Sequence, residues 1–262
     1  MAKASQSDGI SLSTYASKWD GMHTARGDRE WHITWEMLSP VLERYIQAVP
    51  ELRSSSGIDC VDVGCGFSDL GLKLCQAHRL SNLWLLDASS VCIEQLRSRF
   101  SQVEGLNLVI RVADCRALPL TDRTVRLVLD KGTLDAMESD EDSRSMLSGL
   151  ARILAPNGLI ISISFPAVKR LALLDEYLPM LGLMHHTYVL PSADMHAAVV
   201  FLSLIFSIPA DGRGASPMPN YAPDERTRRM LRCAAMSGSL YEDASDFHPP
   251  DPFDFEDANE EG

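Results

Sequence analysis

Residues 58–68 read IDCVDVGCGFS, and this stretch decides the fold. Its first six residues are largely apolar and β-branched, as in a buried strand, and a glycine turn follows them directly. Because Gly64 and Gly66 lack a Cβ atom, the backbone can turn tightly there and a ligand can lie against it. A helix expected to begin near Asp69 points its amide N–H groups at the same place. The stretch therefore predicts a strand, a ligand-binding turn and a helix.

The same alternation of strand and helix continues along the chain. Further strands are expected at residues 83–86, 108–112, 125–129 and 159–165, with helices between them. Ser139 followed by Asp142 is typical of a helix start, and residues 156–158 (Pro-Asn-Gly) predict a turn before the strand that follows. Strands separated by helices form a parallel sheet that is covered on both faces.

The last part of this region follows a different pattern. A helix is expected at residues 167–181, and then two strands at about 185–190 and 198–207, between which no helix fits. We therefore expect an α/β fold, a Rossmann-like doubly wound, mostly parallel seven-stranded sheet with helices on both faces and a C-terminal antiparallel strand pair.

Composition divides the chain into four parts. Residues 1–12 are small and polar and are expected to be disordered. Residues 13–207 form the expected domain, which begins with a segment that holds Trp19, Trp31 and Trp35 and an apolar helical pattern at 37–49. Residues 208–240 hold a Gly/Pro-rich loop and a basic helix at about 224–235. Residues 241–262 are expected to form a disordered acidic tail, because they hold little apolar material.

The charge distribution argues against nucleic acid as a partner. The 262 residues include 24 Lys and Arg and 36 Asp and Glu, a net charge of −12, but nine of the acidic residues follow Tyr241. Residues 1–241 hold the other 27 acidic residues and all 24 basic ones, a net charge of −3. A nearly neutral body offers no general electrostatic footprint for DNA or RNA. The tail itself has two interpretations, recruitment of a basic substrate or an aid to solubility.

Other features of the sequence bear on location and metals. The longest apolar run, at 197–206, is about half of the ~20 residues that a membrane-spanning helix needs. Six cysteines without C-x-x-C spacing favour reduced thiols. Residues 1–17 contain no arginine, which mitochondrial presequences are rich in, so a cytoplasmic location is expected over a mitochondrial one. The protein is expected to be a monomer. His185, His186 and His196 have no second cluster of ligands, so no metal is expected.

Special residues stand at the ends of four predicted strands: the glycine turn, Asp87, Asp114 and Asp130. In an open parallel sheet, ligands bind at the carboxyl ends of the strands, near the point where the strand order reverses. Asp87 follows Gly66 by 21 residues, the distance at which an acidic residue can accept hydrogen bonds from both ribose hydroxyls. Asp114 is placed to accept one from an adenine amino group. Together these residues predict a site for an adenosine-containing cofactor.

One candidate for the adenosine-containing cofactor is a dinucleotide. Dinucleotide-binding turns prefer G-x-G-x-x-G, and here Asp69 takes the third glycine position. A carboxylate there would face a pyrophosphate. S-adenosylmethionine fits better, because it carries ribose and adenine but a sulfonium and an amino-acid end in place of phosphates.

Four stretches carry a resemblance to a known family: DVGCGFS at 62–68, LDAS at 86–89, VAD at 112–114 and LDKGTLDA at 129–136. They resemble the seven-β-strand methyltransferases of the methyltransferase-like family. The similarity runs over residues 15–206 and is greatest to eukaryotic protein-lysine methyltransferases, including those acting on elongation factor 1A and on mitochondrial citrate synthase.

The resemblance implies a set of cofactor-binding residues. Trp19, His23 and Trp31 match aromatic positions that fold over the cofactor, with His23 in place of a tyrosine, and aromatic faces attract a sulfonium cation. An alternative is that Trp19, Trp31 and Trp35 only pack the N-terminal helix on the sheet. The remaining matches are Gly64 beside the methionine part, Asp87 and Ala88 at the ribose, Asp114 and Cys115 at the adenine, and Asp130 near the sulfonium and amino group. Gly66 of the same turn is also expected to bind the cofactor.

The activity that the resemblance implies is methyl transfer to a lysine side chain of a protein. This in-line displacement mainly requires alignment of the nucleophile behind the methyl group. Lysine must react as the neutral amine, which desolvation favours and a carboxylate would position and relieve of its charge. Asp130 and Asp135 are the catalytic candidates. The alternatives are a small-molecule N- or O-methyltransferase and a catalytically silent cofactor-binding scaffold.

Overall fold

The computed structural model describes residues 12–26, 32–47, 57–191 and 199–207. Trp31, the helix predicted at 224–235 and the predicted acidic tail lie outside these residues, as do residues 1–11. Within the described part, no helix has the length and apolar character that crossing a membrane requires.

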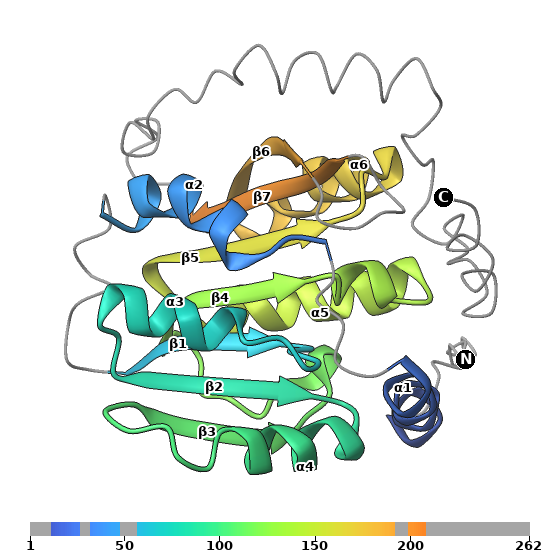
Figure 1. The fold of residues 1–262 in the computed structure, drawn as a ribbon. Helices are drawn as coiled ribbons and strands as arrows, with labels where there is room; N and C mark the ends of the chain where they lie inside the picture. The colour runs from blue at the N-terminus through green and yellow to red at the C-terminus, as the bar shows by residue number, and fades with distance from the viewer. Residues whose placement is uncertain (1–11, 27–31, 48–56, 192–198, 208–262) are drawn as a thin grey trace, which may run out of the picture.

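A seven-stranded sheet forms the centre of the domain, in the order β3-β2-β1-β4-β5-β7-β6, which confirms the predicted fold class (Figure 1). The strands β1 to β5 are parallel, and β7 is antiparallel to both β5 and β6. The strands are β1 (Ile58–Val63), β2 (Asn82–Asp87), β3 (Asn107–Val112), β4 (Val125–Lys131), β5 (Leu154–Ser164), β6 (Leu183–Pro191) and β7 (Val199–Ser207). The α-helices are α1 (Leu12–Arg26), α2 (Trp35–Gln47), α3 (Leu70–His78), α4 (Ser90–Arg99), α5 (Asp140–Ile153) and α6 (Val168–Tyr177).

The two faces of the sheet carry separate apolar cores, because side chains alternate along each strand. In β1, Cys60 belongs to the core under α2, α3 and α4, whereas Val61 and Val63 belong to the core under α5 and α6. The helices therefore form a layer on each side of the sheet, as Figure 1 shows with α3 in front and α5 behind.

Strand order reverses at β1, which has β2 on one side and β4 on the other. This arrangement makes the carboxyl ends of β1 and β4 the expected ligand site. In Figure 1 the arrows of β1, β2 and β4 point towards α1, which lies beyond their tips. The N-terminal helix is therefore positioned to cover the edge at which the predicted cofactor residues stand.

Three predicted boundaries need correction. The turn expected at 156–158 lies inside β5, because Leu154 already pairs with Val125 before the register shifts to Leu159 opposite Leu127. Residues 155–158 therefore form a bulge, with Asn157 at a φ of 61°. The helix expected at 167–181 ends at Tyr177 and continues as a 3₁₀ turn from Pro179 to Leu181, since a proline inside a helix removes a backbone donor. At the N-terminus Leu12 already begins α1.

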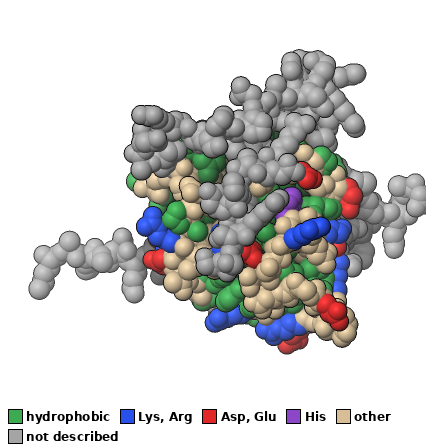
Figure 2. Space-filling view, turned by 90° about the vertical axis from the view of Figure 1, so that its left-hand side faces the viewer, with side chains coloured by type: hydrophobic (Ala, Val, Ile, Leu, Met, Phe, Trp, Pro, Cys, Tyr) green, Lys and Arg blue, Asp and Glu red, His purple; other side chains and the backbone are tan. Residues whose placement is uncertain are grey.

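The amino ends of the strands are held by a buried ion pair. Asp59 at the start of β1 accepts a 2.6 Å hydrogen bond from Arg126 of β4, and its other oxygen accepts from the amides of Ser81 and Asn82. Figure 2 views the molecule from this side, where acidic and basic side chains are interspersed on the visible coloured surface. The pair thus joins β1, β2 and β4 at the edge opposite the predicted site.

We predict that Asp59→Ala lowers the free energy of unfolding by about 3–5 kcal/mol, because it leaves a buried guanidinium without its carboxylate. Arg126→Met should cost less, since Asp59 keeps its amide donors. Urea denaturation of the two variants measures the difference. Equal losses for the two variants would contradict this account of the pair.

Candidate active site

The glycine turn after β1 has the geometry that the sequence predicts. Gly64 and Gly66 have positive φ angles of 63° and 51°, which side chains rarely adopt. A Cβ atom on Gly64 would overlap the side chain of Thr133, whose hydroxyl donates a 2.8 Å hydrogen bond to the carbonyl of Val63. At Gly66 a Cβ atom would meet nothing closer than His23, at 3.6 Å. The turn is therefore closed against Thr133 on one side and open at Gly66.

Asp87 links this turn to the start of α4. Its Oδ2 accepts a 2.9 Å hydrogen bond from the Gly66 amide, and its Oδ1 accepts a 2.8 Å bond from the Ser89 amide. Burial raises the pKa of this carboxyl, although the two amide donors oppose the shift. Each oxygen of a carboxylate can accept about two hydrogen bonds. Asp87 therefore keeps acceptor capacity on both oxygens, as binding a ribose diol requires.

The helix α1 places a row of aromatic rings over the turn. Tyr15, Trp19 and His23 are four residues apart and so share one face of the helix. The His23 ring lies 4.8 Å from that of Phe67, edge to face, and 6.1 Å from that of Trp19. The helix is fixed at Asp20, which accepts a 2.5 Å hydrogen bond from the hydroxyl of Ser89. The structure thus brings His23 to the turn, whereas Trp19 lies beside His23 and packs against the core under α5. Trp31 lies outside the described residues.

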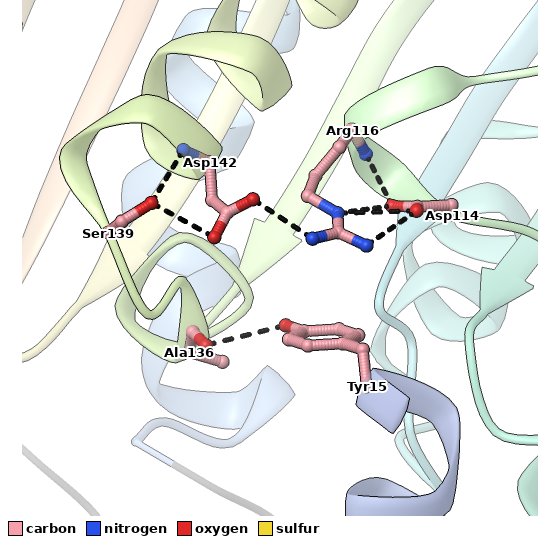
Figure 3. Close-up of polar contacts among 6 residues, drawn as sticks. All are labelled: Tyr15, Asp114, Arg116, Ala136, Ser139 and Asp142. Atoms are coloured by element: carbon pink, nitrogen blue, oxygen red, sulfur yellow. Dashed lines mark hydrogen bonds and ion pairs between the residues drawn. The ribbon is translucent and has the colours of Figure 1, made fainter. Parts of the chain in front are cut away.

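At the end of β3, Asp114 is paired with an arginine that the sequence analysis did not single out. The Asp114 carboxylate accepts from the Arg116 guanidinium at 2.9 and 3.0 Å and from the Arg116 amide at 2.9 Å (Figure 3). The net effect of these contacts holds the pKa of Asp114 below its usual range, against the opposing effect of burial. Cys115 is buried beside this pair, and burial raises the pKa of its thiol. Ala88, which follows Asp87 in the chain, is partly buried and packs against the core under α5.

Asp130, at the end of β4, is almost completely buried, with 1% of its surface exposed. Its Oδ1 accepts from the amides of Thr133 and Leu134, and its Oδ2 accepts a 2.6 Å hydrogen bond from the Ser162 hydroxyl. Burial raises the pKa of this carboxyl. These bonds shape residues 130–134 and attach them to β5, so the structure shows an organising role. Contact with a substrate amine stays a prediction.

Asp135 lies in a second buried polar group. Its Oδ2 accepts a 2.8 Å hydrogen bond from the Phe165 amide and lies 3.7 Å from Nε2 of His32, while Oδ1 lies 3.6 Å from Nε of Arg170. Burial raises the pKa of Asp135 to about 7 and lowers that of His32 to about 3, the latter with help from the Lys131 charge. The group therefore holds a carboxyl and an imidazole that both favour their uncharged forms.

Sequence reasoning missed His32, Arg116 and Arg170. His32 has a φ of 64° and packs edge to face on Phe165 at 4.3 Å. It fits there because Gly132 has no side chain: a Cβ atom would lie 2.6 Å from the imidazole. No local pattern marks His32 or Arg170, because their contacts in the site are with residues 132–135, which are distant from both in the sequence. Arg116 lies only two residues after Asp114, so the sequence could have predicted it as the ion-pair partner of that carboxylate.

A family profile described as a methyltransferase domain matches residues 60–158. Residues 60–158 are thus similar to a methyltransferase domain. The match spans β1 and the glycine turn, the ends of β2, β3 and β4, and the start of β5. The resemblance stated from the sequence is confirmed.

Several curated proteins are similar to this chain. It is 30% identical over 154 residues to the eEF1A lysine and N-terminal methyltransferase of Xenopus laevis, which covers 56% of this chain and 21% of that protein. It is 28% identical to EEF1A lysine methyltransferase 4 of Bos taurus, covering 57% of this chain and 60% of that one. The methyltransferase domain thus spans about a fifth of the first relative's length.

Solved structures support the fold. A magnesium protoporphyrin IX methyltransferase from Synechocystis, solved with bound SAH, superposes with a TM-score of 0.53 at 16% identity, covering 74% of this chain and 96% of that one. A methyltransferase from Leishmania major gives a TM-score of 0.56 at 12% identity, covering 74% and 82%. At these identities the likeness concerns the arrangement of the sheet and its helices.

We predict a pH-dependent effect of Asp135→Asn on stability. The carboxyl titrates near 3.8 when unfolded and near 7 when folded, so the folded state binds more protons and loses stability as pH rises between these values. At pH 8 this loss corresponds to about 4 kcal/mol, which the Asn variant avoids. His32 acts in the opposite sense, because its lowered pKa costs stability as pH falls from 6.5 to about 3. Since both proteins contain His32, this contribution cancels in their difference.

Urea denaturation at pH 4 and pH 8 tests this prediction. The stability of Asp135→Asn relative to the unmodified protein should rise between the two pH values. Asp122→Asn removes an exposed carboxylate and controls for the change in net charge. A relative stability of the Asp135 variant that is independent of pH would contradict the assignment.

Proposed function

We propose that this chain is an S-adenosylmethionine-dependent methyltransferase that methylates a lysine side chain of a protein. One observation carries the proposal: the buried Asp87 carboxylate joins the glycine turn to α4 under the aromatic face of α1. The curated relatives named above, which are called lysine methyltransferases, support lysine as the target. We also propose that the active form is a monomer and that it is located in the cytoplasm.

The described residues fit this cofactor. Gly66 leaves an open cradle, and Asp87 has free acceptor positions for ribose hydroxyls beside Ala88. We place adenine at Asp114 and Cys115, and the sulfonium end near Gly64, Asp130 and the face of Trp19 and His23, with Trp31 completing the cover. When bound, the cofactor supplies an electrophilic methyl group on a positively charged sulfur.

The chain's own residues orient the acceptor and exclude water. The aromatic rings of α1 cover the turn and desolvate the site, which favours the neutral form of a lysine amine. Asp130 and Asp135 set the path of the loop at residues 130–136, at the carboxyl end of β4, where the acceptor amine would enter. In the proposal these two carboxyls position the loop at residues 130–136. The raised pKa of Asp135 suits this carboxyl to take up the proton that the amine releases.

We predict that the purified protein transfers a labelled methyl group to a lysine of elongation factor 1A, the protein that the relatives' names specify. Asp87→Asn should lower cofactor affinity about 100-fold, because two charge-assisted hydrogen bonds to ribose are lost. Calorimetry with S-adenosylhomocysteine and mass spectrometry of the modified peptide measure the two effects.

Asp69→Asn is the matched control, since this carboxylate stands at the same turn but pairs with Lys73 and Arg99 on the surface. It should bind the cofactor as the unmodified protein does. Label on small molecules of a cell extract, with no labelled polypeptide, would favour the small-molecule alternative. Cofactor binding without any transfer would favour the scaffold, and no binding would overturn the proposal.

A further inference from the structure

Arg116 contacts three separate parts of the site through one guanidinium group. Its Nε and one terminal nitrogen form a two-pronged pair with Asp114, and the other terminal nitrogen donates a 2.9 Å hydrogen bond to Asp142 in the first turn of α5. The central carbon of the group, Cζ, lies over the Tyr15 ring of α1, 5.1 Å from the ring centre. Figure 3 shows this arrangement, with the guanidinium between the two carboxylates and above the ring.

The pairing fixes both the charge and the direction of the Asp114 carboxylate. Only 11% of the Arg116 side chain is exposed, so water screens the pair weakly. A planar guanidinium that engages both oxygens allows the carboxylate little rotation. Asp142 is itself fixed, because its amide and one carboxylate oxygen are hydrogen-bonded to Ser139, the residue that caps α5. Asp114 is thus anchored through Arg116 to a helix end.

The third contact connects this anchor to the cover. Tyr15 is 95% buried, and its hydroxyl donates a long 3.4 Å hydrogen bond to the carbonyl of Ala136. A cation over the face of an aromatic ring is attracted to it, and burial strengthens the attraction. Trp19 follows one turn later on the same face of α1. The covering helix therefore contacts the residue that also holds Asp114, in addition to its hydrogen bond through Asp20.

We infer that Arg116 is a positioning residue for the cofactor, which aims the Asp114 carboxylate at the adenine amino group and holds α1 over the site through Tyr15. This inference rests on the proposed function, in which Asp114 contacts the adenine. In this inference, recognition of the adenine and the position of α1 over the site both depend on the Arg116 side chain. The opposing interpretation is that Arg116 occupies Asp114 and competes with adenine for it.

Two nucleosides distinguish these interpretations: S-adenosylhomocysteine and its deaminated analogue S-inosylhomocysteine, in which a carbonyl replaces the amino group. Calorimetry should show that Arg116→Gln weakens binding of the adenosine compound about ten- to a hundredfold and reduces the preference over the inosine compound. Arg116→Lys, which keeps the charge but loses the two-pronged geometry, should reduce the preference as well. An unchanged preference, or tighter binding by Arg116→Gln, would overturn the inference.

Two variants of Tyr15 separate the two roles of Arg116. Tyr15→Phe keeps the ring and should bind both nucleosides nearly as the unmodified protein does. Tyr15→Leu removes the ring and should weaken both nucleosides to the same extent, because it loosens the cover without moving Asp114. Arg144→Gln is the matched control, since Arg144 also lies over a tyrosine ring, that of Tyr177, but away from α1. A loss with Arg144→Gln equal to that with Arg116→Gln would contradict the assignment.

Hydrogen exchange of the α1 amides, measured without ligand, tests the tie to α1 independently of the proposed function. Arg116→Gln and Tyr15→Leu should each speed exchange in α1 several-fold while the amides of β1 and β4 stay protected. If the unmodified protein binds neither nucleoside, the proposed function fails, but this measurement still decides whether Arg116 holds α1. Unchanged exchange in both variants would show that it does not.

Discussion

The Asp87 carboxylate is the contact on which the rest of the site depends. It accepts one amide hydrogen bond from the glycine turn and one from the start of α4, and Ser89 passes the connection on to Asp20 of the covering helix. A buried carboxylate is costly unless its oxygens are hydrogen-bonded. The turn and α4 supply the amide donors that satisfy it, and α1 is joined to them through Asp20 and Ser89. In the proposal, the remaining acceptor positions of Asp87 bind the ribose hydroxyls.

The buried carboxylates at the amino ends of the strands differ from those at the carboxyl ends in how their charge is compensated. At the amino ends, Asp59 is paired with the Arg126 guanidinium and also accepts from two backbone amides, so these contacts contribute stability. At the carboxyl ends, Asp87 keeps spare acceptors and Asp135 is held where its pKa rises to about 7. Groups in such a state destabilise the fold near neutral pH, a cost that proteins accept where a site must bind or react.

The sheet and the strand-end residues were predictable because their signals are local. A β-branched run before a glycine turn, or an aspartate that ends a strand, can be read from a few neighbouring residues. The bulge at 155–158 was not, because it depends on Leu154 pairing across the sheet with Val125. His32 was missed for a related reason: its partners lie on other elements, and the distances between elements are set by packing. Arg116 lies only two residues from Asp114, so that pair could have been predicted, whereas its contacts with Asp142 and Tyr15 could not. The predicted roles of the site residues remain predictions.

The central claim is that the strand-end carboxylates and the aromatic face of α1 converge on a single nucleoside. A crystal structure of the protein with S-adenosylhomocysteine tests it most directly. The account predicts both ribose hydroxyls within hydrogen-bond distance of Asp87, the adenine amino group at Asp114, and the sulfur beneath Trp19 and His23. A nucleoside bound elsewhere, or one held at the glycine turn without contact to Asp87, would contradict it.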